Sequence, residues 1–130
     1  MLMFEVDRVI LSFDFQNRSF NWVDKVSVLN ELKMNEDQFL DVCLLSGVEG
    51  ICPTFPPMSD PFNFKIICDT IKQFRSGLQA IQMYAENPSM SLSYPDIFCR
   101  TRCMIKFHLI MNENGEVEAL NHEYAPKYGL

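Results

Sequence analysis

One stretch of the sequence constrains the fold more than any other, because it carries both a start signal and a stop signal for a helix. Asn35 is a favourable N-cap, and Gln38 stands three residues later, where its side chain can complete a capping box. Apolar residues follow at helical spacing, and Gly47 supplies a terminator. The pattern predicts a helix between Asn35 and Gly47.

The residues before this helix carry strand signals. Residues 2–4 are apolar and are interpreted as a short buried strand. Residues 9–15 begin as an apolar run and then alternate between apolar and polar side chains, and residues 19–23 alternate again after a polar turn, which predicts a β-hairpin. Apolar residues then recur at helical spacing over 25–33, where a short helix is expected.

Prolines shape the segment after the predicted helix. Pro53, Pro56 and Pro57 exclude a helix or a central strand between Val48 and Met58. Because apolar residues lie between these prolines, the segment is expected to be an ordered loop with buried side chains.

The second half of the chain is predicted to contain three more helices and a C-terminal hairpin. Asn114-Gly115 is the clearest signal, since this dipeptide favours the positive φ angles of a tight hairpin turn. The predicted elements are a helix beginning within residues 60–63, a short helix over 78–84 after a break at Gly77, a helix from Asp96, and strands over 107–111 and 116–120.

Charge limits the partners that this chain can bind. The 130 residues carry a net charge of −6, whereas nucleic-acid affinity depends on Lys and Arg neutralising phosphates. Two loose basic clusters are interpreted as solvated helix faces; they are Lys65, Lys72 and Arg75, and Arg100, Arg102 and Lys106. No apolar run approaches the roughly 20 residues of a membrane span. We therefore expect no membrane partner and a cytoplasmic location.

The five cysteines are odd in number and irregular in spacing, which favours reduced thiols over a disulfide framework. Cys43, Cys68 and Cys99 lie in apolar patterns and are expected to be buried. Cys99 and Cys103 would share a helix face, but no second pair of cysteines follows, and His108 and His122 are the histidines of the chain. We expect no zinc site from this spacing.

The predicted helix and its continuation, residues 35–49, resemble a stretch of the flap endonucleases and XPG nucleases, which belong to the PIN-like superfamily. In that family a glycine ends the helix and an aspartate two residues later helps to hold a catalytic metal. Gly47 matches the glycine, and Glu49 takes the place of the aspartate, so the resemblance implies a weak, degenerate ligand position at Glu49. The alternative interpretation of Glu49 is a solvated loop carboxylate.

The resemblance also implies what the chain lacks. Cleavage by this family needs two metal ions about 4 Å apart, held by several carboxylates. The family's other acidic residues have no matching positions in this sequence, and Cys52-Pro53-Thr54-Phe55-Pro56-Pro57 replaces its glycine-rich DNA-gripping turn. We therefore expect a fragment or a truncated product with no catalytic residues. Asp14 is interpreted as an outward-facing hairpin residue between buried neighbours.

A second resemblance runs over nearly the whole chain. Residues 52–57, 74–81, 100–107 and 114–118 are similar to segments of the fungal Mkt ("maintenance of killer") family of post-transcriptional regulators. This similarity implies control at the level of mRNA without a demonstrated need for nuclease chemistry. It also implies a protein partner that is ataxin-2-like and associated with poly(A)-binding protein, with RNA reached only indirectly.

Together these observations predict an α/β fold: a partial PIN-like domain with a short sheet or hairpin, four to five helices and a C-terminal β-hairpin. Residues 1–60 would form the XPG-I/PIN-like segment, and residues 61–130 a helical extension with the second hairpin. The expected function is that of a non-catalytic nuclease-like module without a cofactor. The alternative is a fragment of a divergent metal-dependent 5′ nuclease, which would need Mg²⁺.

Overall fold

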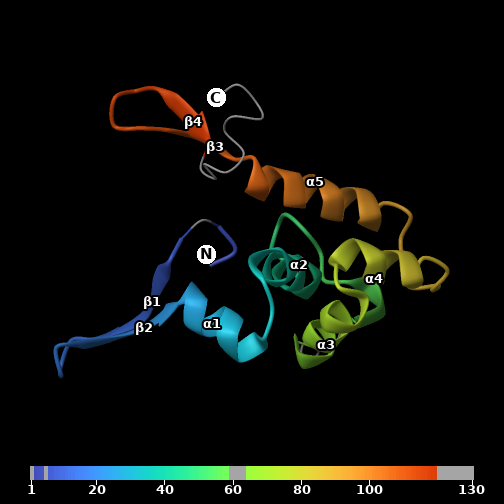
Figure 1. Cartoon of the computed structure of the whole chain (residues 1–130), viewed down its shortest axis with the longest axis horizontal. Coiled ribbons are helices and arrows are strands. Elements are labelled where there is room, and N and C mark those ends of the chain that lie inside the picture. Colours follow the sequence, from blue (N-terminus) through green and yellow to red (C-terminus); the bar gives the residue numbers. More distant parts are fainter. Residues whose placement is uncertain (1, 5, 59–63, 120–130) are drawn as a thin grey trace.

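The computed structural model describes residues 2–4, 6–58 and 64–119, and these residues form a mixed α/β structure of five helices and two small antiparallel sheets (Figure 1). The elements in chain order are β1 (Arg8–Asp14), β2 (Ser19–Asp24), α1 (Lys25–Leu32), α2 (Glu36–Ser46), the single 3-10 turn η1 (Pro56–Met58), α3 (Phe64–Phe74), α4 (Gly77–Met83), α5 (Tyr94–Lys106), β3 (Leu109–Met111) and β4 (Val117–Ala119). The coarse α/β prediction with four to five helices and a C-terminal hairpin is confirmed.

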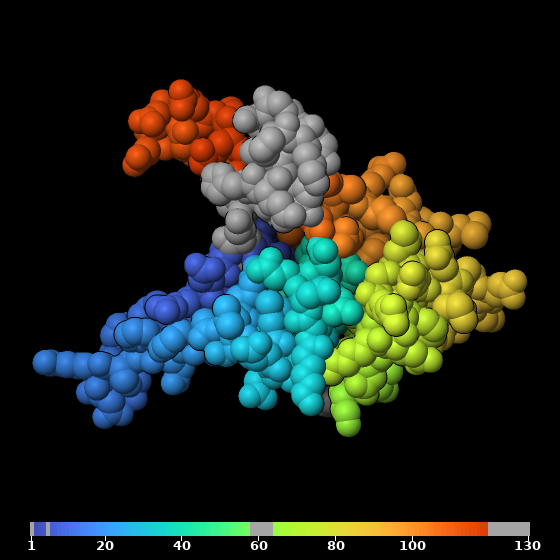
Figure 2. All heavy atoms as spheres, in the orientation of Figure 1, coloured from blue at the N-terminus to red at the C-terminus, as the bar shows by residue number. Residues whose placement is uncertain are grey.

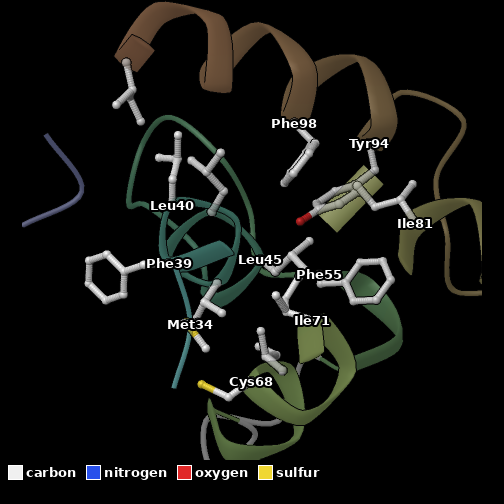
Figure 3. Close-up of a cluster of buried hydrophobic side chains, with 14 residues drawn as sticks. Met34, Phe39, Leu40, Leu45, Phe55, Cys68, Ile71, Ile81, Tyr94 and Phe98 are labelled. Carbon is white, nitrogen blue, oxygen red and sulfur yellow. The ribbon is translucent and has the colours of Figure 1, made fainter. Parts of the chain in front are cut away.

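The core is built around α2, which contacts α3, α4 and α5. In Figure 1, α5 runs above α2 and α4, α3 lies below them, and α1 leads into α2 from the left. Figure 3 shows Tyr94 and Phe98 pointing from α5 into the cluster of buried side chains. Members of that cluster with essentially no exposed surface include Val42, Leu44, Leu45, Phe55, Ile71, Ile81, Tyr94 and Phe98.

Helix α2 forms where the sequence predicts it. The Asn35 carboxamide oxygen accepts the Gln38 backbone N–H at 2.8 Å, and the Gln38 side-chain oxygen accepts the Asn35 N–H at 3.1 Å. This reciprocal pair satisfies donors that have no partner within the helix. Gly47 ends the helix at φ 96°, a backbone conformation that favours glycine. The predicted capping box and terminator are confirmed.

The N-terminal hairpin is also confirmed, but its environment differs from the prediction. Strand β1 pairs with β2 in antiparallel register, with Leu11 as an extra residue between Ile10 and Ser12. The Phe13 and Phe15 side chains are exposed, so the expectation that the neighbours of Asp14 are buried is wrong. The predicted strand over residues 2–4 is wrong as well, since the backbone of these residues follows turns and bends.

The proline-containing segment is an ordered loop with buried side chains, as predicted. Phe55 and Cys52 are buried, and Phe55 packs against the rings of Tyr84 and Tyr94. The Phe55 backbone N–H donates to the Leu45 carbonyl at 2.8 Å, which ties the loop to the end of α2. The loop therefore contributes to the core although it contains no regular helix or strand beyond η1.

Boundaries in the second half differ from the sequence predictions by a few residues. The predicted start within residues 60–63 lies outside the described residues. The break between α3 and α4 falls at Arg75, whose φ is 69°, and Gly77 is the first residue of α4 instead of a break. Helix α5 begins at Tyr94, two residues before Asp96, because Pro95 is accommodated in its first turn. The turn at Asn114-Gly115 is confirmed, with Gly115 at φ 79°.

Within the described ranges, no helix has both the length and the apolar character that crossing a membrane requires.

Candidate functional site

Glu49 lies at the tip of a tight loop that follows α2. The backbone closes this loop through paired hydrogen bonds between Val48 and Cys52, at 2.8 and 2.9 Å. Glu49 is exposed, and its loop borders an open hollow of about 520 Å³ that reaches from Ser46 to Thr54. The carboxylate is therefore accessible to solvent, as the interpretation of a solvated loop residue expects.

Acidic residues do not gather around Glu49 in the part of the chain that the structure describes. There, no three His, Cys, Asp or Glu side chains come close enough together to hold a metal ion. Because Mg²⁺ in a nuclease centre is held by several oxygen ligands, Glu49 and its described neighbours do not form such a centre. The ligand role of Glu49 stays a prediction that depends on carboxylates from elsewhere.

Asp14 is a turn-stabilising residue. Its carboxylate accepts hydrogen bonds from the Asn17 side chain at 2.7 Å and from the backbone N–H groups of Gln16 and Asn17 at 3.1 Å. The Asn17 side-chain bond is the largest cause of the lowered pKa of Asp14, because it favours the charged form. The prediction that Asp14 faces solvent is correct, and its contacts explain the residue without a catalytic role.

The histidines and cysteines are dispersed over the structure. His108 precedes β3 instead of lying inside it, and its ring meets Phe4 edge to face at 6.4 Å. His122 lies outside the described residues.

All five cysteines are free: Cys52 and Cys68 are buried, Cys43 is partly buried, and Cys99 and Cys103 are exposed. Burial raises the pKa of Cys43 to about 11. The prediction of a buried thiol is therefore confirmed for Cys68 and wrong for Cys99, while Cys43 is only partly buried.

An ion-pair network between α2 and α5 was not foreseen. The buried Asp41 carboxylate accepts the Arg102 Nε–H at 2.8 Å, and Asp37, one turn earlier, lies 3.5 Å from the same guanidinium. Lys106 also pairs with Asp37. The side chains of Arg102 and Lys106 are only 30% and 13% exposed, so the interpretation of both as solvated is wrong. Arg100 does lie on the surface, as do Lys65, Lys72 and Arg75.

A third helix joins this network through Gly77. The Gly77 backbone N–H donates to the second Asp41 carboxylate oxygen at 2.8 Å. A Cβ atom at Gly77 would lie 2.7 Å from the Phe98 ring and 3.0 Å from the Asp41 Cβ, so the approach of α4 depends on the absence of a side chain. Asp41 therefore links α2, α4 and α5 at one buried point.

The N-terminal hairpin displays a large apolar surface. The register places Trp22 opposite Ile10 and Phe20 opposite Phe13, and alternation puts Trp22 and Phe20 on one face. Phe15, in the turn, stacks on Phe13 with ring centroids 6.0 Å apart. We call these five residues the hairpin surface; their exposed fractions range from 48% to 87%. Figure 2 shows the hairpin projecting from the body of the molecule.

The opposite face of the hairpin borders a groove. Val9 and Leu11 of the hairpin line the groove together with Phe39 and Cys43 of α2 and with Phe64. The groove has a volume of about 570 Å³ and an apolar lining. Exposed apolar surface of this extent, on both faces of a hairpin, is typical of a site that contacts another protein surface.

Comparison with known proteins finds no matching family model and no matching solved structure. The chain is 34% identical, over 115 residues or 88% of its length, to the post-transcriptional regulator MKT1 of Cryptococcus neoformans var. grubii. It is 23% identical over 121 residues, or 91% of its length, to the post-transcriptional regulator MKT1 of Saccharomyces cerevisiae. In both cases the chain spans about 15% of the length of the relative. These similarities support the Mkt family of fungal post-transcriptional regulators as the family of this chain, which corresponds to one segment of those proteins.

Proposed function

We propose that this chain is a non-catalytic, nuclease-like module of a post-transcriptional regulator, with a partial PIN-like fold, and that it acts through protein contacts in the cytoplasm. The regulatory role is supported by its similarity to two post-transcriptional regulators. The hairpin surface is the observation that supports a role in protein contacts, since it exposes five large apolar side chains to solvent on a two-stranded hairpin.

Charge and chemistry favour a protein over a nucleic acid as the direct partner. The net charge of −6 opposes the approach of a polyphosphate backbone. Two cations that could have formed a basic patch, Arg102 and Lys106, are engaged with aspartates of α2. Aromatic residues such as Trp22, in contrast, are enriched where protein surfaces bind one another.

The partner that the family resemblance implies is an ataxin-2-like protein associated with poly(A)-binding protein. Binding of such a partner to the hairpin surface would bring the module to mRNA without direct RNA recognition. No cofactor enters this mechanism, because the contact needs only burial of apolar surface and completion of hydrogen bonds along the strand edges.

A substitution in the hairpin surface tests this function. Trp22→Ser should weaken binding of the chain to a purified ataxin-2-like protein by about 30-fold or more, because a central tryptophan commonly contributes at least about 2 kcal/mol to an interface. Isothermal titration calorimetry measures the effect. Leu92→Ser is the matched control, since Leu92 is a fully exposed apolar residue in the loop before α5 and should leave the affinity unchanged. Equal losses in both variants would contradict the proposal.

The alternative function, a metal-dependent nuclease, rests on the exposed carboxylate of Glu49 at the motif position. A flap substrate incubated with this chain and Mg²⁺ or Mn²⁺ should remain uncleaved. Cleavage by the wild-type chain that disappears in Glu49→Gln would establish the alternative and sink the non-catalytic function. Cleavage that survives Glu49→Gln would show that Glu49 is not a ligand, and would equally refute the non-catalytic function.

A further inference from the structure

Two of the five cysteines stand apart from the rest. Cys99 and Cys103 are exposed on α5, whereas Cys52 and Cys68 are buried and Cys43 is partly buried. They are four residues apart, so both lie on the same side of the helix. In Figure 1, α5 runs along the upper edge of the core with α2 and α4 beneath it. The buried residues of α5, which are Tyr94, Phe98, Thr101 and Ile105, lie on the other side of the helix from the two cysteines.

One chain has too few cysteines for a complete zinc site, but the spacing of this pair suits half of one. Side chains at i and i+4 have Cβ atoms about 5–6 Å apart. Zinc binds thiolate sulfur at about 2.3 Å, so two sulfurs of one tetrahedral site lie roughly 3.8 Å from each other. Rotation about the Cα–Cβ bonds of the two exposed cysteines can bring their sulfur atoms to this separation without a change in the helix.

One copy of the chain supplies only half of such a site. A structural zinc ion takes four ligands, and the described residues contain no group of three or more metal-binding side chains. We propose that two copies of this chain bind one Zn²⁺ between their α5 helices, each contributing Cys99 and Cys103. A two-fold axis through the metal satisfies this arrangement, because both copies present the same surface.

The residues around the pair are compatible with this contact. Asp96 and Arg100 on this side of α5 pair with each other at 3.0 Å and have side chains that are 61% and 78% exposed, so a second helix can approach the cysteines. Four thiols lose four protons to solvent as four Zn–S bonds form, the zinc ion loses its bound water, and no oxidation state changes.

Titration of the reduced, metal-free 130-residue chain with Zn²⁺ tests the proposal. Light scattering should show the molar mass doubling from 15.1 kDa, with an end point of one zinc ion per two chains. Co²⁺ in place of Zn²⁺ should give the intense absorption of a tetrahedral all-thiolate site. One zinc ion per chain without dimerisation would overturn the proposal, and so would the absence of zinc binding.

Variants assign the ligands. Cys99→Ser and Cys103→Ser should each abolish the zinc-dependent doubling, whereas Asp96→Asn, which changes a carboxylate on the same exposed side, should leave it intact. Zinc-dependent dimers that persist in the double cysteine variant would refute the site. A second readout needs no variant: zinc should protect Cys99 and Cys103 of the wild-type chain from alkylation by iodoacetamide, mapped by mass spectrometry. Unchanged alkylation of these two residues would also refute it.

Discussion

Phe55→Ala should lower the free energy of unfolding of this chain by about 3–5 kcal/mol, the usual loss when a fully buried phenylalanine is truncated. Phe55 is 0% exposed, and it lies against Tyr84 and Tyr94, with ring centroids 5.6 and 5.7 Å away. The cavity would open where the loop, α4 and α5 meet. Thermal melts followed by circular dichroism should show a fall in Tm of roughly 10–20 °C.

Phe15→Ala is the matched control for this loss. The same side chain is removed from the hairpin turn, where it is 87% exposed, and the expected change is below about 0.5 kcal/mol. Phe55→Leu keeps most of the apolar volume and should fall between the two. Similar melts for Phe55→Ala and Phe15→Ala would mean that the loop does not contribute to the core.

The Phe55 result bears on what the loop does. The resemblance to the XPG nucleases implies that the proline-containing segment stands in place of a glycine-rich turn that grips DNA. In this structure the Phe55 side chain fills the core, and the Phe55 backbone N–H donates to the Leu45 carbonyl. The Thr54 hydroxyl lies 3.3 Å from the Ser46 carbonyl oxygen. Backbone donors that are engaged within the fold are not free to bind phosphate. This packing supports the proposal that the module contacts protein rather than DNA.

Features that depend on local sequence could be predicted well. The capping box at Asn35, the glycine terminator at Gly47 and the turn at Asn114-Gly115 are each encoded by neighbouring residues, and all three form as expected. The prediction of a strand at residues 2–4, which is wrong, rested only on an apolar run. Such a run forms a strand only where another strand pairs with it. Burial of Phe13 and Phe15 failed for a related reason, because alternation does not show what covers the apolar face.

The candidate site shows the same division. Exposure of Glu49 followed from its loop position. Exposure of Asp14 was predicted from strand alternation, although its neighbours Phe13 and Phe15 are exposed as well. The Asp41 network did not follow from local sequence, because it joins residues 61 positions apart in sequence. One signal was present: Asp37 and Asp41 are spaced four residues apart, as are Arg102 and Lys106, so two helices carry matching pairs of opposite charge. Recognising the match requires knowing that α2 and α5 pack together.

Asp41→Ala should destabilise the chain by about 2–4 kcal/mol. Removing one partner of a buried ion pair costs about 3–5 kcal/mol, because the other charge loses its compensation. The loss of stability is reduced because Arg102 is partly exposed and still has Asp37 at 3.5 Å. It is increased because the Gly77 N–H loses its hydrogen-bond acceptor. Urea denaturation should report the loss as a lower midpoint with an unchanged slope.

Asp37→Ala separates burial from charge in this network. Asp37 contacts the same Arg102 and also Lys106, but its side chain is 62% exposed, whereas that of Asp41 is 3% exposed. Exposed pairs contribute about 0–1 kcal/mol, so this variant should lose far less stability than Asp41→Ala, although both remove one aspartate from α2. A double-mutant cycle between Asp41→Ala and Arg102→Ala should give a coupling energy of about 1–3 kcal/mol. If the two aspartate variants are equally destabilised, or the coupling is near zero, Asp41 does not hold α5 to α2 through Arg102.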